Sequence, residues 1–301
     1  MYKRLLIPLD GSRLAESVLP AAAFLATHLH ASVVLIHVIE HGGPSEVHGE
    51  RHLHTETEAV DYLRSIAATF SAGVPVETHV HTEHIESVTK SIVQHVTEYS
   101  SDLILMCAHG RSGAKQFLFG AIAQQVLSLG AVSVILFRAP AATTQESFVL
   151  NNLLLPLDGQ PTHEHSIPVA RSLAKLAGAA IHLLRVVPTY GHLSGTWIPT
   201  SRLLPSTTTR MLDIAVQEAQ EYLDGWKATL TDDHINVTTE VSRGDPSNVV
   251  AEIAEDRRSD LIVVGTHGKV GTDAFWSGSV APKICRTCTT PVLLVPAAIS
   301  P

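Results

Sequence analysis

A strand-like apolar run lies near the carboxyl end of the chain. It is followed by two glycines, a loop, and a third glycine that stands next to a serine. The run covers residues 260–264, and the pattern after it is Gly265-x2-Gly268-x9-Gly278-Ser279. Because glycine has no Cβ, backbone N–H groups at these points can approach a ligand closely. A helix that begins at Ser279 would add unpaired N–H groups and a positive dipole end. This combination suits an anion, most simply a phosphate.

The chain contains an internal repeat. The segment RLLIPLDG at residues 4–11 recurs as NLLLPLDG at residues 152–159, and residues 102–110 recur at 260–268. The later pair is spaced more widely than the first pair, so the second copy carries a net insertion. The halves meet at a polar connection over residues 140–147, which is typical of a linker.

Each half alternates strand-like and helix-like segments. Continuous apolar runs such as residues 5–9 and 103–108 indicate strands buried on both faces. A capping box at Thr55 indicates the start of a helix. Strands that alternate with helices predict a parallel sheet with helices on both faces. We therefore predict two similar doubly wound, five-stranded α/β domains, at residues 1–140 and 148–301.

Four residues mark the carboxyl ends of the predicted strands. Asp10 and Asp158 follow the first strand of each half, and Val38 and Val186 end the second strand. In open parallel sheets, ligands bind beyond the carboxyl ends of the strands. We expect these residues and the glycine turns to converge on one edge of each half.

Asp158, Val186 and the glycine pattern that ends at Ser279, in this order, resemble the universal stress protein family. The resemblance covers essentially the whole chain twice, so the protein resembles a tandem universal stress protein. It implies an adenine-nucleotide α-hydrolase-like fold and an ATP-binding stress-response regulator, with or without magnesium as a second cofactor. It also implies that terminal strands such as residues 291–295 pair two domains. In a tandem chain the partner can be the other half, which would pair the two domains within one molecule, and a homodimer of whole chains is left open.

The resemblance implies a role for each matched residue. Asp158 and the backbone of Val186 would hold the adenosine end, and Gly265 would let the backbone approach the ribose. Lys269 could add a charge-assisted contact. The predicted contacts at the phosphates and in the same loop are His267, Gly268, Lys269, Gly278 and Ser279.

The first half departs from the pattern. Cys107 stands where the second half has Gly265, and Ala121 stands where it has Ser279. Glu83 aligns with a glycine of the second half and would repel a phosphate. We predict that the second half binds nucleotide and that the first binds weakly or not at all. The weaker first-half counterparts are Asp10, Val38, Gly110 and Gly120.

Motifs for other nucleotide chemistry are absent from the sequence. There is no G-x4-G-K-[S/T], no G-x-G-x-x-G after a strand and no G-x-S-x-G. No catalytic residue is therefore assigned. Three functions are left open: an ATP-binding regulator, a nucleotide-independent scaffold or interaction module, and a slow ATPase.

The composition excludes several classes of protein. The chain has 301 residues, of which 45% are hydrophobic, and a formal net charge of -8. A chain with this net negative charge has no overall electrostatic attraction for nucleic acid or an anionic membrane. No run approaches the ~18 apolar residues of a membrane span. Three cysteines are too few for a secreted disulfide framework. We expect a cytoplasmic protein that binds neither nucleic acid nor membrane.

Histidines and cysteines form two further groups. Neutral imidazoles in groups can ligate zinc or copper, but these histidines match no zinc-binding spacing. We predict solvated side chains and no metal site. The C-x-x-C of Cys285 and Cys288 precedes the last strand, and we expect it to pack at a helix end. The grouped histidines are His48, His52 and His54, then His79, His81 and His84.

Overall fold

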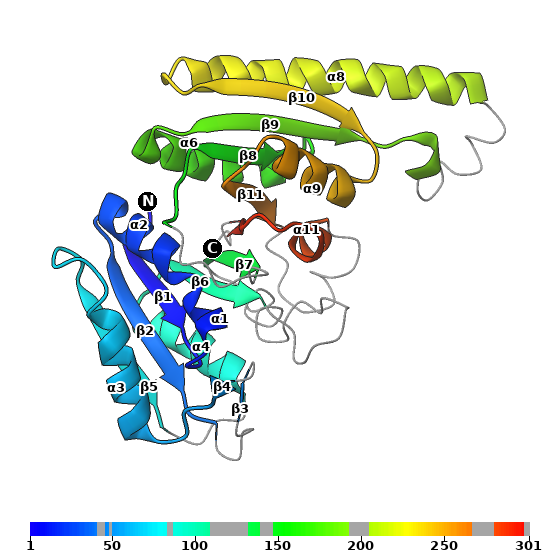
Figure 1. The fold of residues 1–301 in the computed structure, drawn as a ribbon. Coiled ribbons are helices and arrows are strands. Elements are labelled where there is room, and N and C mark those ends of the chain that lie inside the picture. Colours follow the sequence, from blue (N-terminus) through cyan, green and yellow to red (C-terminus); the bar gives the residue numbers. More distant parts are fainter. Residues whose placement is uncertain are drawn as a thin grey trace. The chain divides into compact units, whose positions relative to one another are not determined.

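The protein divides into two compact units in the computed structural model (Figure 1). Unit 1 is built mainly from Met1–Val149, and unit 2 mainly from Leu150–His267 with the last strand of the chain. The structure describes residues 1–40, 46–47, 50–82, 87–108, 132–138, 147–192, 205–266 and 280–297.

Unit 1 contains a parallel five-stranded sheet in the order β7-β6-β1-β2-β5. Its strands are β1 (Arg4–Pro8), β2 (Ser32–Val38), β5 (Val76–His81), β6 (Leu103–Ala108) and β7 (Ser133–Arg138). Its described helices are α1 (Arg13–Glu16), α2 (Leu19–Leu29), α3 (Glu56–Ala67) and α4 (Val88–Glu98). A short antiparallel pair, β3 (Glu46–Val47) and β4 (Glu50–Arg51), lies between β2 and α3 in the sequence.

Unit 2 repeats this arrangement, with the strand order β10-β9-β8-β11-β12. Its strands are β8 (Asn152–Pro156), β9 (Ala180–Val187), β10 (Val237–Arg243), β11 (Leu261–Thr266) and β12 (Val292–Pro296). Its described helical segments are η1 (Pro161–His163), α6 (Ser166–Ala177), η2 (Tyr190–His192), α8 (Pro205–Thr231), α9 (Pro246–Asp256) and α11 (Ala281–Thr287). The long helix α8 runs along β9 and β10 (Figure 1).

Continuous apolar runs form the central strands of both sheets. Leu5, Leu6 and Ile7 of β1 have no exposed surface, and neither do residues 153–155 of β8. Strands of this kind must be covered on both faces. The predicted doubly wound α/β architecture, with helices on both faces of each parallel sheet, is confirmed.

Side-chain caps fix where two helices begin. The hydroxyl of Thr55 accepts the backbone N–H of Glu58 at 3.3 Å, so the predicted capping box is confirmed. In unit 2, the Asp245 carboxylate accepts the backbone N–H groups of Ser247 and Asn248 at 3.0 and 3.2 Å. These bonds satisfy donors that have no partner within the helix.

One predicted helix is two helices in the structure. The sequence predicts a single helix over residues 12–28, but α1 ends at Glu16 and α2 begins at Leu19. Pro20 lies in the first turn of α2, where a residue without an N–H starts a helix well and continues one poorly. The sequence also predicts a helix over residues 120–129, which lies outside the described residues.

A carboxylate ties the start of two neighbouring strands together in each unit. Asp102, just before β6, accepts the backbone N–H groups of Lys3 and Arg4 at 2.8 and 3.0 Å. In unit 2, Asp260 accepts those of residues 151–152 at 2.7 and 2.8 Å. The same device therefore sets the register of both sheets at their amino ends.

No helix in the described part of the chain has both the length and the hydropathy needed to cross a bilayer.

We expect Asp102→Ala and Asp260→Ala each to destabilise the protein by about 1–3 kcal/mol, because each removes two hydrogen bonds to a charged acceptor. Chemical denaturation followed by circular dichroism measures the loss. Asp256→Ala, at the exposed end of α9, is the control and should change stability by less than about 0.5 kcal/mol. Equal stability of all three variants would contradict this role.

Candidate functional site

Strand pairing brings three predicted contact residues of unit 2 to one edge of its sheet. Strand β8 pairs in parallel with both β9 and β11. Asp158 comes just after β8, while Val186 and Gly265 are the penultimate residues of β9 and β11. All three therefore lie at the carboxyl ends of adjacent strands, where doubly wound sheets bind ligands.

Two donors orient the Asp158 carboxylate. One oxygen accepts the backbone N–H of Gln160 at 3.0 Å, and the other lies 2.6 Å from Nδ1 of His163. The Asp158 side chain is nevertheless 52% exposed. Because an ionised carboxylate has about four acceptor positions, it can still accept hydrogen bonds from a ligand.

A cation borders the turn after Asp158. Gly159 has a φ of +75°, and a Cβ at this position would lie 2.8 Å from the Arg185 guanidinium. The guanidinium in turn lies 5.1 Å from the ring centroid of Tyr222 on α8, within cation–π range. The Tyr222 hydroxyl donates to Glu164 at 2.8 Å. The positive φ therefore favours glycine here, and a side chain at this position would have to displace the guanidinium.

Gly265 makes room for protein backbone. A Cβ on this residue would collide with the carbonyl oxygen of His163 and would lie 3.2 Å from its carbonyl carbon. Next along the chain, the His165 ring lies 2.7 Å from the carbonyl oxygen of Val295 in β12. The segment from η1 to α6 is therefore held against β11 and β12. The access of a ribose at Gly265 stays a prediction, whereas the close approach of η1 is part of the fold.

The corresponding edge of unit 1 has an apolar cover. Asp10 accepts both the backbone N–H and the hydroxyl of Ser12, at 2.9 and 2.6 Å. Gly11 has a φ of +89°, and a Cβ there would lie 3.0 Å from the Leu53 side chain. Leu53 belongs to the segment after β4. An apolar side chain thus packs on this turn, where unit 2 has the Arg185 cation.

Two further positions of the predicted pattern lie on strands of unit 1. Val38 ends β2 and is 7% exposed. Cys107 lies buried in β6, opposite Phe137 of β7, so this strand accommodates a side chain where β11 has glycine. The predicted residues outside the described part of the chain are Glu83, Gly110, Gly120, Ala121, His267, Gly268, Lys269, Gly278 and Ser279.

The expectation of solvated histidines is wrong for His52 and His81, which are 2% and 8% exposed. The His52 ring packs edge-on against His54, with centroids 5.0 Å apart. Other imidazoles pack against these rings once the chain folds, which their sequence positions do not indicate. His48 and His84 lie outside the described residues.

The C-x-x-C motif lies at a helix end, as predicted. Cys285 occupies the last turn of α11, and Cys288 is its C-cap residue. Burial, and then the neighbouring Cys288, raises the pKa of the Cys285 thiol. Because the thiolate is the reactive form, this environment opposes redox chemistry at the pair.

Comparison with known proteins identifies the family. The model of the universal stress protein family matches residues 1–138 and 150–296. This chain belongs to the universal stress protein family. It carries two domains of that family in tandem.

Some related universal stress proteins match almost the whole chain, and others match about half of it. One from Mycolicibacterium smegmatis is 24% identical over 300 residues, covering 97% of this chain and 96% of the relative. One from Methanocaldococcus jannaschii is 32% identical over 147 residues, covering 48% of this chain and 80% of the relative. The solved structure of a universal stress protein from Archaeoglobus fulgidus covers 98% of both chains with a TM-score of 0.68 and 17% identity, a likeness in fold.

Three neighbours of the predicted site were not predicted from the sequence. His163 and Arg185 flank Asp158 in unit 2, and Leu53 covers the matching turn in unit 1. Arg185 stands directly before Val186, where the other universal stress protein domain has His37, so comparing the halves could have found it. Leu53 follows a stretch with no usable periodicity, and only the tertiary structure shows what it covers.

Gly265→Ala is expected to destabilise unit 2 by about 1–3 kcal/mol or more, because the added methyl must displace the His163 backbone. Gly225→Ala, in the middle of α8, is the matched control. A Cβ there meets nothing within 4 Å, and alanine should stabilise the helix by about 0.5–1 kcal/mol. Chemical denaturation measures both, and an unchanged Gly265→Ala variant would contradict the close approach.

Proposed function

We propose that this tandem universal stress protein is an ATP-binding regulator of a stress response, with one nucleotide bound at the carboxyl edge of unit 2. The Asp158 carboxylate carries the proposal: it is oriented by Gln160 and His163 yet remains 52% exposed. A group that is already oriented loses little freedom on binding. Its oxygens can accept hydrogen bonds from a ribose hydroxyl or an adenine amino group.

The sequence after β11 supports a phosphate site at the same edge. Gly268, Gly278 and Ser279 follow that strand in the family's spacing, and backbone N–H groups at such turns suit phosphate oxygens. Lys269 adds a cation to this loop, and Arg185 adds one beside Gly159. In a chain with a net charge of -8, these local charges and dipoles must supply the attraction for a polyanion, with or without magnesium.

Contacts in unit 1 support the proposal that the two domains differ in their affinity for nucleotide. Leu53 packs against the turn at Gly11, and the buried Cys107 takes the place of Gly265. Both add side-chain atoms at an edge that a nucleotide would need to enter. We therefore propose that unit 1 binds nucleotide weakly or not at all and serves as the structural partner of unit 2.

Binding, rather than turnover, is the proposed activity. The groups around Asp158 orient a ligand, but none of them is arranged as a nucleophile with its base. A nucleotide held by residues after β8, β9 and β11 would stabilise unit 2 by mass action. Occupancy could thereby select the conformation or the partner through which the protein signals.

Isothermal titration with ATP and magnesium should give one ATP per chain. Asp158→Ala should weaken binding about 10-fold or more through the loss of a hydrogen bond to a charged acceptor. Gly278→Val should abolish binding without unfolding the protein, as checked by circular dichroism.

Asp10→Ala is the matched control in unit 1 and should leave both affinity and stoichiometry unchanged. Two equal sites, or loss of binding in Asp10→Ala alone, would contradict the unequal-domain proposal. No binding at millimolar ATP would favour the nucleotide-independent scaffold. Hydrolysis that depends on Asp158 would favour the slow ATPase.

A further inference from the structure

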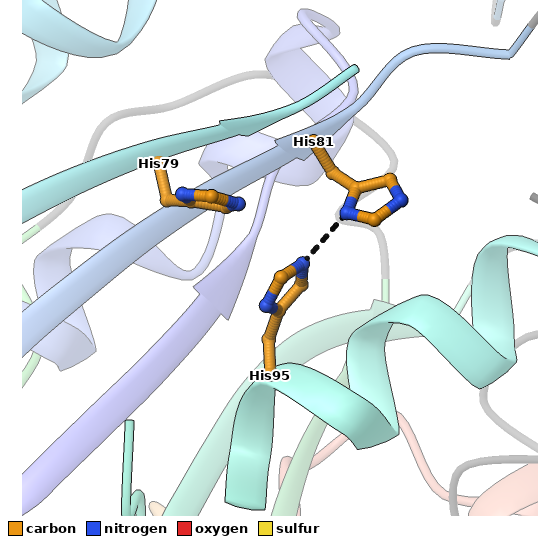
Figure 2. A group of neighbouring side chains, drawn as sticks. All are labelled: His79, His81 and His95. Carbon is orange, nitrogen blue, oxygen red and sulfur yellow. Dashed lines mark hydrogen bonds between the residues drawn. The ribbon is translucent and has the colours of Figure 1, made fainter. Parts of the chain in front are cut away.

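Three histidines from two elements of unit 1 meet beside its sheet (Figure 2). His79 and His81 alternate along β5, so their side chains lie on the same face, and His95 reaches them from α4. One ring nitrogen of each histidine, the atom that could ligate a metal, lies within 4.8 Å of the corresponding nitrogens of the other two. His81 and His95 are buried and His79 is half-buried. We call this group the histidine cluster.

A carboxylate fixes the tautomer of one ring. Nδ1 of His95 lies 2.7 Å from a carboxylate oxygen of Glu98, and its Nε2 lies 3.0 Å from Nδ1 of His81. An ionised carboxylate can only accept, so Nδ1 of His95 carries the N–H and, in the neutral ring, Nε2 offers a lone pair to the cluster. A carboxylate that orients a histidine in this way is the usual outer partner of a metal-binding imidazole.

Burial and a neighbouring aromatic ring shield the cluster. Burial, and then the neighbouring His95, lowers the pKa of His79. The Tyr99 ring packs beside the cluster, with its centroid 5.7 Å from that of His79. On Tyr99 lies the Arg4 guanidinium, 5.6 Å from the ring centroid, and an ion pair with Glu77 balances its charge.

Unit 2 shows that the fold does not require histidines on the edge strand. The registers of β2 with β5 and of β9 with β10 make Glu240 the counterpart of His79, and Ser242 that of His81. Glu240 forms an ion pair with Arg257 at 2.7 Å. Because Glu240 is engaged with Arg257 and Ser242 offers no imidazole, the corresponding place in unit 2 is unsuited to a metal ion.

The position of His95 on α4 is not occupied by histidine in unit 2 either. Matching backbone hydrogen bonds at the ends of α4 and α9 make Ile253 the counterpart of His95. Ile253 is 9% exposed, so an apolar side chain fills this position in the second copy of the fold. Packing alone therefore does not explain a third imidazole facing two others.

We propose that His79, His81 and His95 bind one divalent first-row transition-metal ion, such as Zn²⁺, in unit 1. Imidazole nitrogen is a good ligand for such ions. Zinc takes ligands at about 2.0–2.1 Å in tetrahedral geometry, which places neighbouring nitrogens about 3.3 Å apart. His81 and His95 are already near this separation, and His79 must close on them by side-chain movement. Water would fill the fourth position.

Metal binding replaces a hydrogen bond with two coordinate bonds. In the metal-free protein, the N–H at Nδ1 of His81 donates to Nε2 of His95. When the ion occupies the space between these nitrogens, the His81 proton is carried by Nε2 instead, so the ring stays neutral. The Glu98 carboxylate keeps its bond to His95 and partly offsets the charge of the ion. The ion would tie the edge strand β5 to α4.

Chelator-stripped full-length protein, titrated with Zn²⁺ against a chromogenic chelator without nucleotide, should bind one ion per chain. His81→Ser and His95→Ile introduce the residues that unit 2 carries at these positions, so both variants should fold. Each is expected to weaken zinc binding by about 100-fold or more. This is a larger loss than is usual when a residue that only hydrogen-bonds a metal ligand is removed. His28→Ala, at an exposed position on α2, is the matched control and should bind like the wild type.

Glu98 is a positioning residue, and its variants should follow a graded order. Glu98→Ala is expected to weaken zinc binding by about 10–100-fold. Glu98→Gln retains an oxygen acceptor for His95 and should lose less. Glu56→Ala, exposed on α3, should have no effect. Equal affinity in Glu98→Ala and the wild type would overturn the assigned role of Glu98.

The C-x-x-C pair is the competing site. The double variant Cys285→Ser, Cys288→Ser should retain one Zn²⁺ per chain, and bound Co²⁺ should show visible absorption without a thiolate charge-transfer band. Loss of binding in the cysteine variant would overturn the proposal, as would undiminished binding in His95→Ile. The absence of stoichiometric binding at micromolar Zn²⁺ would also overturn it. None of these outcomes depends on whether ATP binds unit 2.

Discussion

Burial of the central strands on both faces is the constraint on which the rest of each unit depends. Leu5, Leu6 and Ile7 of β1 have no exposed surface, and a strand covered on both faces favours apolar side chains along its length. The polar groups of the two proposed sites lie in two kinds of place. One is the carboxyl end of a strand, where Asp158 lies. The other is the less covered edge strand, where His79 lies on β5.

Duplication placed this one fold in the chain twice and allowed the polar positions to diverge. The turn at Gly11 is packed by Leu53, whereas the turn at Gly159 is bordered by Arg185. On the edge strands, unit 1 has imidazoles where unit 2 has the ion pair of Glu240 with Arg257. Each unit thus serves as a natural control for the other. The proposed nucleotide and metal sites use positions that the shared core leaves free.

Glycines in this protein serve physical needs that their spacing does not distinguish. Gly265 stands in a ligand-like pattern, yet the direction of its missing side chain is filled by the His163 backbone. Gly159 admits a positive φ and a guanidinium together. A spacing pattern shows that a side chain is excluded but not what excludes it. A bound ligand, a neighbouring cation and a carbonyl group would each favour glycine at the position.

The sequence by itself determined the repeat, the family, the doubly wound architecture and the strand ends on which Asp158 and Val186 lie, because apolar periodicity and turn residues are local properties. It also identified the cap at Thr55. Only the tertiary structure decided which side chains meet. His95 is 14 residues from its partner His81, and the packing of α4 beside β5 brings the two rings together. That packing depends on the whole sheet, which no short segment encodes.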